Sequence, residues 1–176
     1  MKKIKNLLSF LLIFFFSVNI SLANAEKIVY IDMDKIMQIS KAGKAAISKI
    51  NDQKKKDVSK FQKIEKDLKA KEEELIAKKN VLSEEEFQNK LGSLSKEINN
   101  YRSLRQEAID LSTKSRLNAS ADFAEKIKPI LADYAAENNI DMIIQKKNII
   151  MGKTDLDITD EILIIVDKKI NKLNVN

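Results

Sequence analysis

The sequence predicts a mainly α-helical protein with a small β body, in which a long antiparallel coiled-coil hairpin projects from an oligomeric, β-barrel-like body. The 176 residues include only three Gly and one Pro, so residues that interrupt helices are rare. One third of the residues are charged and only 6% are aromatic, which is too polar for one compact globule. Apolar residues at heptad spacing run through the polar middle of the chain, and this pattern is typical of a coiled coil.

Residues 1–25 have the composition of a secretory signal peptide. A start with three Lys precedes an apolar run over 7–20, and the small residues of 23–25 form a cleavage site. A membrane anchor is the alternative, but the run is short for a span and is interrupted by Ser17 and Asn19. We therefore expect export through the Sec pathway and cleavage after Ala25.

The exported chain should carry little net charge and no disulfide. The signal peptide holds three of the 32 basic residues and no acid, so its removal lowers the net charge from +6 to +3. The chain has no Cys, which excludes a disulfide and a lipid-modified cysteine after the signal. These features predict a soluble protein, located in the periplasm if the cell is Gram-negative.

The first part of the exported chain, 26–50, predicts a strand followed by a helix. The segment "KIVYI" at 27–31 is apolar on both alternating faces, which indicates a strand buried on both sides. Asp32 or Asp34 can cap a helix over 35–50. Small residues around Gly43 in this helix would allow another element to approach closely.

The hairpin arm is predicted over 51–119 from two apolar stripes. On the first helix Phe61, Leu68, Leu75 and Leu82 recur every seven residues, and a 4-3 rhythm begins at Phe87 on the second. If the chain folds back near residue 83, antiparallel partners have numbers with a nearly constant sum, which pairs Phe61 with Leu104, Leu68 with Ile98 and Leu75 with Leu91. The predicted seam is therefore Phe61, Leu68, Leu75, Leu91, Ile98 and Leu104.

The stretch "KNVLSEEEF" predicts the tip of this hairpin, near 80–84. Ser83 and Glu86 form a capping box, and acids in the first turn favour a helix that starts at Glu84. Leu82 and Phe87 would close the end of the seam. An uninterrupted helix with a chance capping pattern is the alternative, but the constant register favours the hairpin.

The returning chain predicts a helix over 119–139, with Pro129 either kinking it or starting a new segment. Two short apolar strands follow at 140–145 and 148–152, joined by a hairpin turn at "KKN". A final helix is predicted over 160–170. Its cap would be Asp157 or Thr159, and the last six residues look frayed.

The body, 26–50 and 120–176, should form by self-association. Three short strands are marginal in a single chain. All three are apolar on both faces, and one subunit hardly provides enough structure to bury both. Strands from several chains joined in one sheet or barrel would bury them. The expected body residues are Ile28, Tyr30, Ile31, Ile143, Ile144, Ile149 and Ile150.

The sequence offers little of the chemistry that catalysis or metal binding needs. Without His and Cys, it lacks the commonest general base, the commonest metal ligand and the strongest nucleophile. The acidic clusters 72–74 and 84–86 fit solvated helix surface, and Asp32 and Asp34 fit capping better than a metal pair. We therefore expect no enzymatic activity, no cofactor and no metal.

The charge of the arm bears on possible partners. Residues 49–79 carry eleven Lys and seven acids, and a Lys-rich face can attract an anionic lipid surface. A solvated face is the simpler interpretation. Nucleic acid is not an expected partner, because the chain is exported, has few aromatics and has no recognition motif.

The order of these parts resembles the OmpH/Skp family of periplasmic chaperones, over about residues 27–171. The resemblance rests on "SKAGKAA" (40–46) and "DLDITDEI" (155–162) placed around a long charged hairpin. It implies a homotrimer whose three hairpins hang from a β-barrel-like body and enclose unfolded outer-membrane proteins without using a nucleotide. One departure is that the basic lipopolysaccharide patch of some relatives has no clear counterpart here.

Two functions are therefore expected from the sequence. The first is an ATP-independent holdase chaperone, since long arms give many weak contacts at high effective concentration. Polar residues in seam positions, Glu65, Glu72 and Lys79, would keep the arms flexible. The second is a structural or adaptor coiled-coil protein of the cell envelope whose tips dock one partner.

Overall fold

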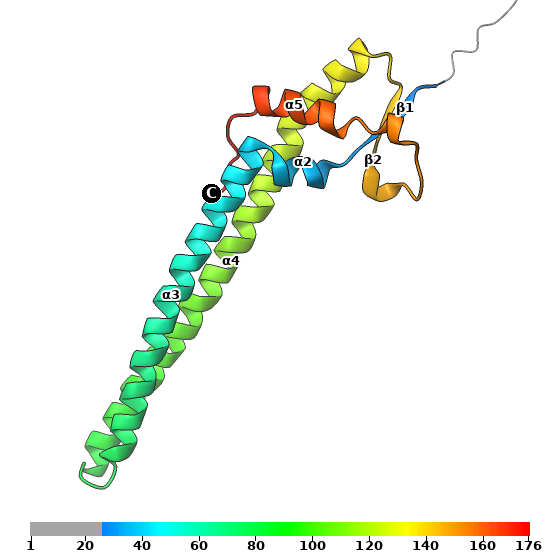
Figure 1. Ribbon diagram of the computed structural model, residues 1–176. Coiled ribbons are helices and arrows are strands. Elements are labelled where there is room, and N and C mark those ends of the chain that lie inside the picture. Colours follow the sequence, from blue (N-terminus) through cyan, green and yellow to red (C-terminus); the bar gives the residue numbers. More distant parts are fainter. Residues whose placement is uncertain (1–25) are drawn as a thin grey trace, which may run out of the picture.

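The computed structural model describes residues 26–176, so the expected signal peptide lies outside the described residues. The chain forms a small body at one end, and one helical hairpin projects from it (Figure 1). The protein is mainly helical, as predicted. In chain order the elements are β1 (Ile28–Ile31), α2 (Met33–Ile39), α3 (Lys41–Ala77), α4 (Glu84–Glu137), β2 (Met142–Gln145), the 3-10 turns η1 (Lys146–Asn148) and η2 (Thr154–Leu156), and α5 (Thr159–Lys169).

The single helix expected over 35–50 is instead two helices that turn at Ser40. The backbone N–H of Ser40 ends α2 on the carbonyl of Ile36, at 2.9 Å, and its hydroxyl accepts from the N–H of Gly43, at 3.2 Å, to start α3. A Cβ on Gly43 would lie 1.8 Å from the carbonyl oxygen of Met37. The small residue therefore permits the close turn between α2 and α3, while the buried Ser40 side chain caps the second helix.

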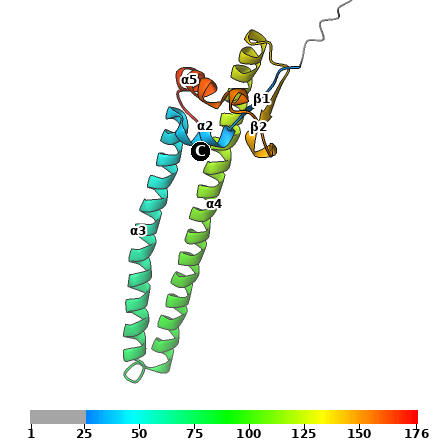
Figure 2. The same ribbon diagram turned by 45° about the vertical axis from the view of Figure 1, so that its right-hand side comes forward.

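Helices α3 and α4 lie side by side as an antiparallel hairpin (Figures 1 and 2). Helix α3 has 37 residues, which corresponds to about 55 Å at 1.5 Å per residue. Helix α4 begins at Glu84, as the capping box indicated. The hydroxyl of Ser83 accepts from the N–H of Glu86, at 3.3 Å, and the Glu86 carboxylate accepts from the N–H of Ser83, at 3.0 Å. The chain therefore reverses between Ala77 and Glu84.

Helix α4 continues through Pro129 as one element, so Pro129 does not start a new helical segment. Proline removes one backbone hydrogen bond from a helix, but the neighbouring Ile127 and Ile130 are buried in the body core and fix the helix there. The helix ends where Asn139 takes a left-handed conformation, with φ 53°. Asn is one of the few residues that adopt this conformation readily, so "NN" does stop the helix.

The sheet has two strands, β1 and β2, which run parallel. Their register pairs Ile28 with Met142, Val29 with Ile143, Tyr30 with Ile144 and Ile31 with Gln145. The whole hairpin arm is the crossover between these two strands. Tyr30 also forms an isolated parallel bridge with Asp157, which attaches the segment before α5 to the other side of β1.

The third strand expected at 148–152 is absent from the described chain. The "KKN" segment is the 3-10 turn η1 rather than a hairpin turn, and the residues after it are irregular. Ile150 and Met151 are almost fully exposed, at 106% and 87%. A strand needs a hydrogen-bonded neighbour, and β2 pairs with β1 alone, so the described subunit supplies none for this segment.

The body core lies where α2, α5 and the body end of α4 meet β1. Helix α5 starts at Thr159, whose N–H donates to the carboxylate of Asp157, at 3.1 Å. The hydroxyl of Thr159 accepts from the N–H of Asp32, at 2.9 Å, and so links α5 to the end of β1. The largest side chains that are almost completely buried there are Ile31, Ile36, Ile127, Ile162 and Val166.

The C-terminal tail, residues 171–176, is ordered rather than frayed, which corrects the prediction from sequence. Leu173 and Val175 are 4% and 8% exposed and belong to the body core. The N–H of Asn174 donates to the carboxylate of Asp122, at 2.8 Å, and the ammonium of Lys126 donates to the carbonyl of Lys172, also at 2.8 Å. The tail is thus attached along α4 at the root of the arm.

Candidate functional site

The arm is the candidate functional site, and its two halves differ in how the helices pack. We define the distal half as residues 64–101, next to the tip, and the proximal half as residues 50–63 and 102–119, next to the body. In the distal half Leu68, Leu75 and Leu94 are buried between the helices. The residues packed against them are Ile64, Leu82, Phe87, Ile98 and Tyr101.

Two of the predicted seam contacts are placed differently in the structure. Leu91, expected opposite Leu75, is 39% exposed, whereas Leu94 is only 8% exposed. Positions three apart on a helix point about 60° apart, and Leu94 is the one that faces α3. The ring of Phe61, expected against Leu104, packs edge-on against Tyr101 with the ring centroids 5.9 Å apart. Leu104 is only half-buried.

Charged side chains cover the distal seam. Lys71 reaches across to Glu97, at 2.8 Å, and along its own helix to Asp67, at 3.0 Å. Hydrogen bonds to Glu97 and then Asp67 raise the pKa of Lys71. Lys78 pairs with Glu74, and the hydrogen bond from Lys78 lowers the pKa of the Glu74 carboxyl. The pair of Lys71 with Glu97 links the two helices, while the pairs with Asp67 and Glu74 run along α3, and all three place ions beside the apolar interior.

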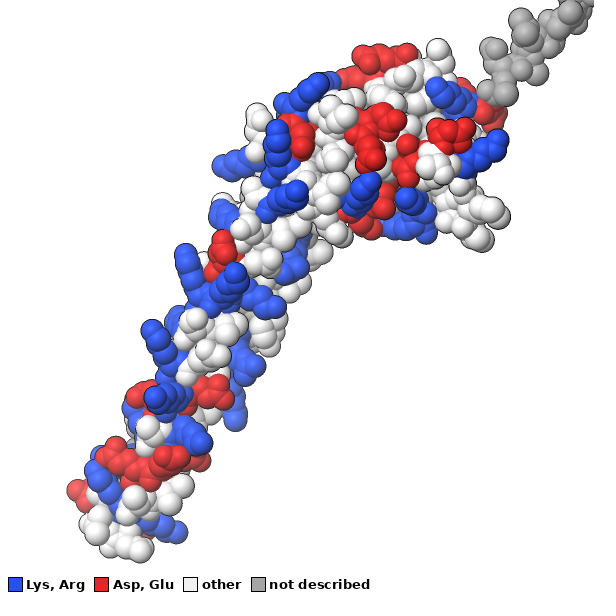
Figure 3. Space-filling model, viewed as in Figure 1, with Lys and Arg blue, Asp and Glu red and all other residues white. Residues whose placement is uncertain are grey.

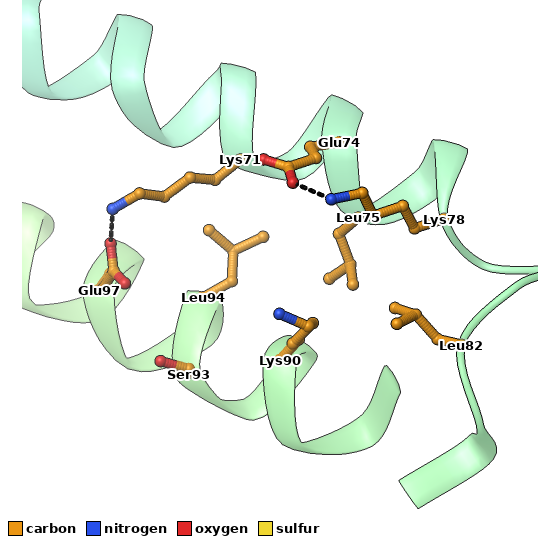
Figure 4. A pocket seen from close by; sticks show the side chains of 9 residues that line it. All are labelled: Lys71, Glu74, Leu75, Lys78, Leu82, Lys90, Ser93, Leu94 and Glu97. Atoms are coloured by element: carbon orange, nitrogen blue, oxygen red, sulfur yellow. Dashed lines mark hydrogen bonds and ion pairs between the residues drawn. The ribbon is translucent and has the colours of Figure 1, made fainter. Parts of the chain in front are cut away.

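A small recess lies near the tip, beside these ion pairs. Figure 4 shows Leu75, Leu82 and Leu94 converging there, with Lys71 bonded to Glu97 beside Leu94. The recess has a volume of about 190 Å³. Ligand pockets usually measure about 300–1,000 Å³, so this recess is too small for a segment of polypeptide. The sequence-predicted tip residues Ser83 and Glu86 form the capping box described above.

The proximal half is loosely packed. Between Ile50 and Leu68 on α3, and between Leu94 and Ala119 on α4, no side chain is fully buried. A crevice of about 550 Å³ lies between the helices here. Its apolar lining comes from Ile50, Phe61, Leu104, Ala108, Leu111 and Val175.

The cause of the loose packing is visible in the sequence of both helices. On α3 the stretch 51–63 offers only Val58 and Phe61 as large apolar residues, and Val58 is half exposed. On α4 the steps from Ile98 to Tyr101 and from Tyr101 to Leu104 are both three residues. Two such steps in succession interrupt the heptad and displace the apolar stripe from the partner helix. The two helices therefore do not close over each other in this half.

The rim of the crevice carries Lys54, Lys60 and Lys114, together with Asp57 and Glu107. None of the ion pairs found in residues 26–176 involves these three lysines. The Lys60 ammonium lies 5.9 Å from the centroid of the Phe61 ring. Figure 3 shows Lys and Arg gathered along the middle of the arm, with acids more frequent near the tip and on the body.

The body also exposes large apolar side chains around the sheet. Ile28 and Met142 are exposed at the start of the two strands, and Ile150 and Met151 are exposed in the irregular segment. We refer to these four residues as the sheet-end patch. The remaining expected body residues, Ile143, Ile144 and Ile149, are half-buried, whereas Tyr30 and Ile31 are buried within the subunit itself.

Tyr30 is the residue that holds the irregular segment in place. Its hydroxyl donates to the carbonyl of Lys153, at 3.1 Å, and the Lys146 ammonium lies 5.8 Å from its ring centroid. Lys146 also pairs with Asp157, at 2.9 Å. Burial acts to raise the pKa of Asp157, but hydrogen bonds from Thr159 and Lys146 outweigh it and lower that pKa.

Sequence reasoning missed three features of the arm and its root: the turn and cap at Ser40, the contacts made by buried Leu94 in place of Leu91 and by half-buried Tyr101 in place of Leu104, and the ordered tail. The tail could have been found from "KLNVN", in which apolar residues alternate with Asn as in an extended segment packed on one side.

Residues 26–176 contain no group of three or more Asp or Glu side chains placed to hold a metal ion. Across the same residues, no helix combines the length and the apolar character needed to cross a membrane.

A long antiparallel helical hairpin on a small α/β body defines the class of protein. Within that class, a family model described as outer membrane protein (OmpH-like) matches residues 27–165, and the chain therefore belongs to the OmpH-like family. The chain is similar to the crystal structure of a proposed outer membrane chaperone (OmpH-like) from Caulobacter crescentus CB15. The TM-score is 0.77 with 13% sequence identity, covering 85% of this chain and 89% of that chain. Among curated proteins, none matches.

Proposed function

We propose that this protein is an ATP-independent holdase chaperone of the periplasm, which encloses unfolded outer-membrane proteins and prevents their aggregation. The observation that carries the proposal is the arm itself, a long hairpin whose proximal half leaves an apolar crevice open between two charged helices. Membership of the OmpH-like family and the likeness to a proposed outer membrane chaperone support it. The expected signal peptide, cleaved after Ala25, would deliver the chain to that compartment.

The proposed active form is a homotrimer built through the body. The sheet-end patch supports it, because an isolated two-stranded sheet with exposed apolar ends is marginal in water. Segment 148–152 would gain in the assembly the hydrogen-bonded neighbour that it lacks in one subunit. Three hairpins held by such a body would surround one client.

Holding a client without a nucleotide requires many weak contacts rather than one tight site. Arms tied to one body give such contacts a high effective concentration, and each can be released thermally. The lysines of the proximal half that make no ion pair in the described chain would also attract acidic clients or an anionic lipid surface.

Aggregation of an outer-membrane β-barrel protein tests the proposal. The client, unfolded in urea, is diluted into buffer with or without this protein at one trimer per client, and light scattering is followed. We expect scattering to be largely suppressed, and serum albumin at equal mass serves as the control. Scattering equal to that of the albumin control would show that the protein is not a holdase.

A structural or adaptor coiled coil is the second candidate function. It is favoured by the exposed apolar residues at the tip, Ile76 at 65% and Val81 at 79%, which could dock one specific partner. In that case the protein would fail the scattering test but would retain one partner from the cell envelope in a pull-down, and replacement of Val81 by Ser would abolish this binding.

A further inference from the structure

The crevice in the proximal half differs from an ordinary gap between helices because part of it is already filled by an extended chain. Val175 of the C-terminal tail lines the crevice together with Ile50, the lining residue of α3 nearest the body. The side chains of Leu173 and Val175, two residues apart, are buried, while Asn174 between them is exposed and its backbone N–H donates to the carboxylate of Asp122 on α4. An extended segment with apolar residues at alternate positions thus fits at the mouth of the space between α3 and α4.

Beyond Val175 the same lining continues without an occupant from the described chain. Phe61 and Leu104 are half-buried and Leu111 is more than half exposed, although all three face the crevice. At about 550 Å³ the space falls in the range of pockets that bind ligands, unlike the recess at the tip. It can take one or two large apolar side chains.

We propose that this crevice binds an extended segment of an unfolded polypeptide whose apolar side chains occur at alternate positions. The segment would lie between α3 and α4, next to the tail. Strands of outer-membrane barrels have this alternation, apolar toward lipid and polar toward the lumen. The tail sequence "KLNVN" has the same alternation. The proposal rests on the proposed function and assigns client contact to the proximal half of the arm rather than to its tip.

The charged residues at the rim should make this site prefer segments that carry acidic residues. Lys54, Lys60 and Lys114 face Asp57 and Glu107 around the opening, so cations are in excess by one. The polar positions of a bound segment would lie at the rim, and acidic residues there would meet lysines that make no ion pair in residues 26–176. Segments that alternate apolar and acidic residues should therefore bind more tightly than those that alternate apolar and basic residues.

The absence of Cys from the chain allows a direct test by site-specific cross-linking. A single Cys replaces Ala108, in the crevice, or Ser103, which is exposed on the same helix and outside the lining. Each variant is labelled with a benzophenone maleimide, mixed with a urea-unfolded outer-membrane barrel protein and irradiated. We expect several-fold more client adduct from A108C than from S103C, attached to segments with alternating apolar residues. Equal yields from the two sites would overturn the proposal.

A matched pair of substitutions tests the same site through affinity. A108Q fills the crevice with a longer polar side chain at a half-buried position, and S103Q makes a similar change on exposed surface. Loss of one buried apolar contact should weaken client binding about tenfold in A108Q and leave S103Q unchanged. Circular dichroism verifies that both variants keep the helical content of the unsubstituted protein.

The outcomes separate this proposal from the proposed function. If the unsubstituted protein suppresses aggregation but A108Q binds clients as tightly as S103Q, the crevice is not the contact site and the holdase function stands. If the unsubstituted protein does not suppress aggregation, the holdase function fails and the occupant named here fails with it.

Discussion

The distal and proximal halves of the arm are built from the same two helices, yet they differ in how completely they bury their apolar side chains. The distal half buries Leu68, Leu75 and Leu94 and covers them with ion pairs such as Lys71 with Glu97. The proximal half leaves Phe61 and Leu104 only partly covered and its lysines without ion pairs in the described chain. The distal half, at the free end where no body supports the helices, is therefore the stiffer half. The proximal half, next to the body, keeps an open and adaptable apolar surface.

The largest expected difference between the halves is in the free energy of unfolding that is lost when a leucine is replaced by alanine. Replacing Leu75 by Ala should destabilise the distal hairpin by about 2–4 kcal/mol, because the side chain is buried and the cavity cannot collapse fully. Replacing the half-buried Leu104 by Ala should cost about 1 kcal/mol or less. Amide hydrogen exchange of residues 64–101 measures the first effect, and exchange of residues 102–119 measures the second. Equal costs would mean that the two halves are packed alike.

The physical reason for this asymmetry was only partly accessible from the sequence. The hairpin, its tip at Ser83 and the stripe on α3 followed from a strict heptad and a capping box, both of which are local signals. The choice of Leu94 over Leu91 did not follow, since both fit the 4-3 rhythm and only the rotation of α4 against α3 separates them. When the spacing between two apolar residues of a heptad changes by one residue, every contact further along the helix shifts to a different position.

Features that depend on contacts between distant segments could not be predicted from the sequence either. The break at Ser40 depends on how closely Met37 approaches Gly43, and the order of the tail depends on Asp122, more than fifty residues away along the chain. The strand expected at 148–152 was inferred from its apolar residues alone. It lacks a neighbour in the subunit, so composition was a poor guide to its conformation.

The tail should matter to the root of the arm and not to the distal half. Replacing Leu173 by Ala removes a buried side chain and should destabilise the root of the arm by about 2 kcal/mol or more. The expected result is faster amide exchange in α4 around Phe123, with unchanged exchange around Leu94. Asn171→Ala, at an exposed position of the same tail, is the control. Faster exchange at both Phe123 and Leu94 would mean that the arm unfolds as one unit.

A smaller effect is expected at the tip. Replacing Ser83 by Ala removes the hydroxyl that caps α4 and should destabilise the first turn by about 1 kcal/mol. The loss should stay local, because the tip lies at the opposite end of the molecule from the body (Figure 1). Sedimentation should find the oligomeric state of the protein unchanged, whereas dissociation of the assembly would contradict this placement of the tip.

The smallest expected effect is the response of the tip to acid. Hydrogen bonds from the hydroxyl and then the backbone N–H of Ser83 lower the pKa of Glu86 below its ordinary value of 4.5. A carboxyl with a depressed pKa stabilises the fold above its unfolded pKa, and this contribution is lost as the pH falls through the folded pKa. The exchange protection of the first turn of α4 should therefore be constant near neutral pH and decline as the pH falls below that ordinary value.

Glu86→Gln isolates this carboxyl from its neighbours. Glutamine can still accept the hydrogen bond of the capping box but does not titrate in this range. The variant should lose part of the pH dependence while keeping most of the protection near neutral pH. The decline that remains would come from Glu74, whose pKa the hydrogen bond from Lys78 also lowers. An identical decline in the variant and the unsubstituted protein would assign the acid response of the distal half to its ion pairs instead of its cap.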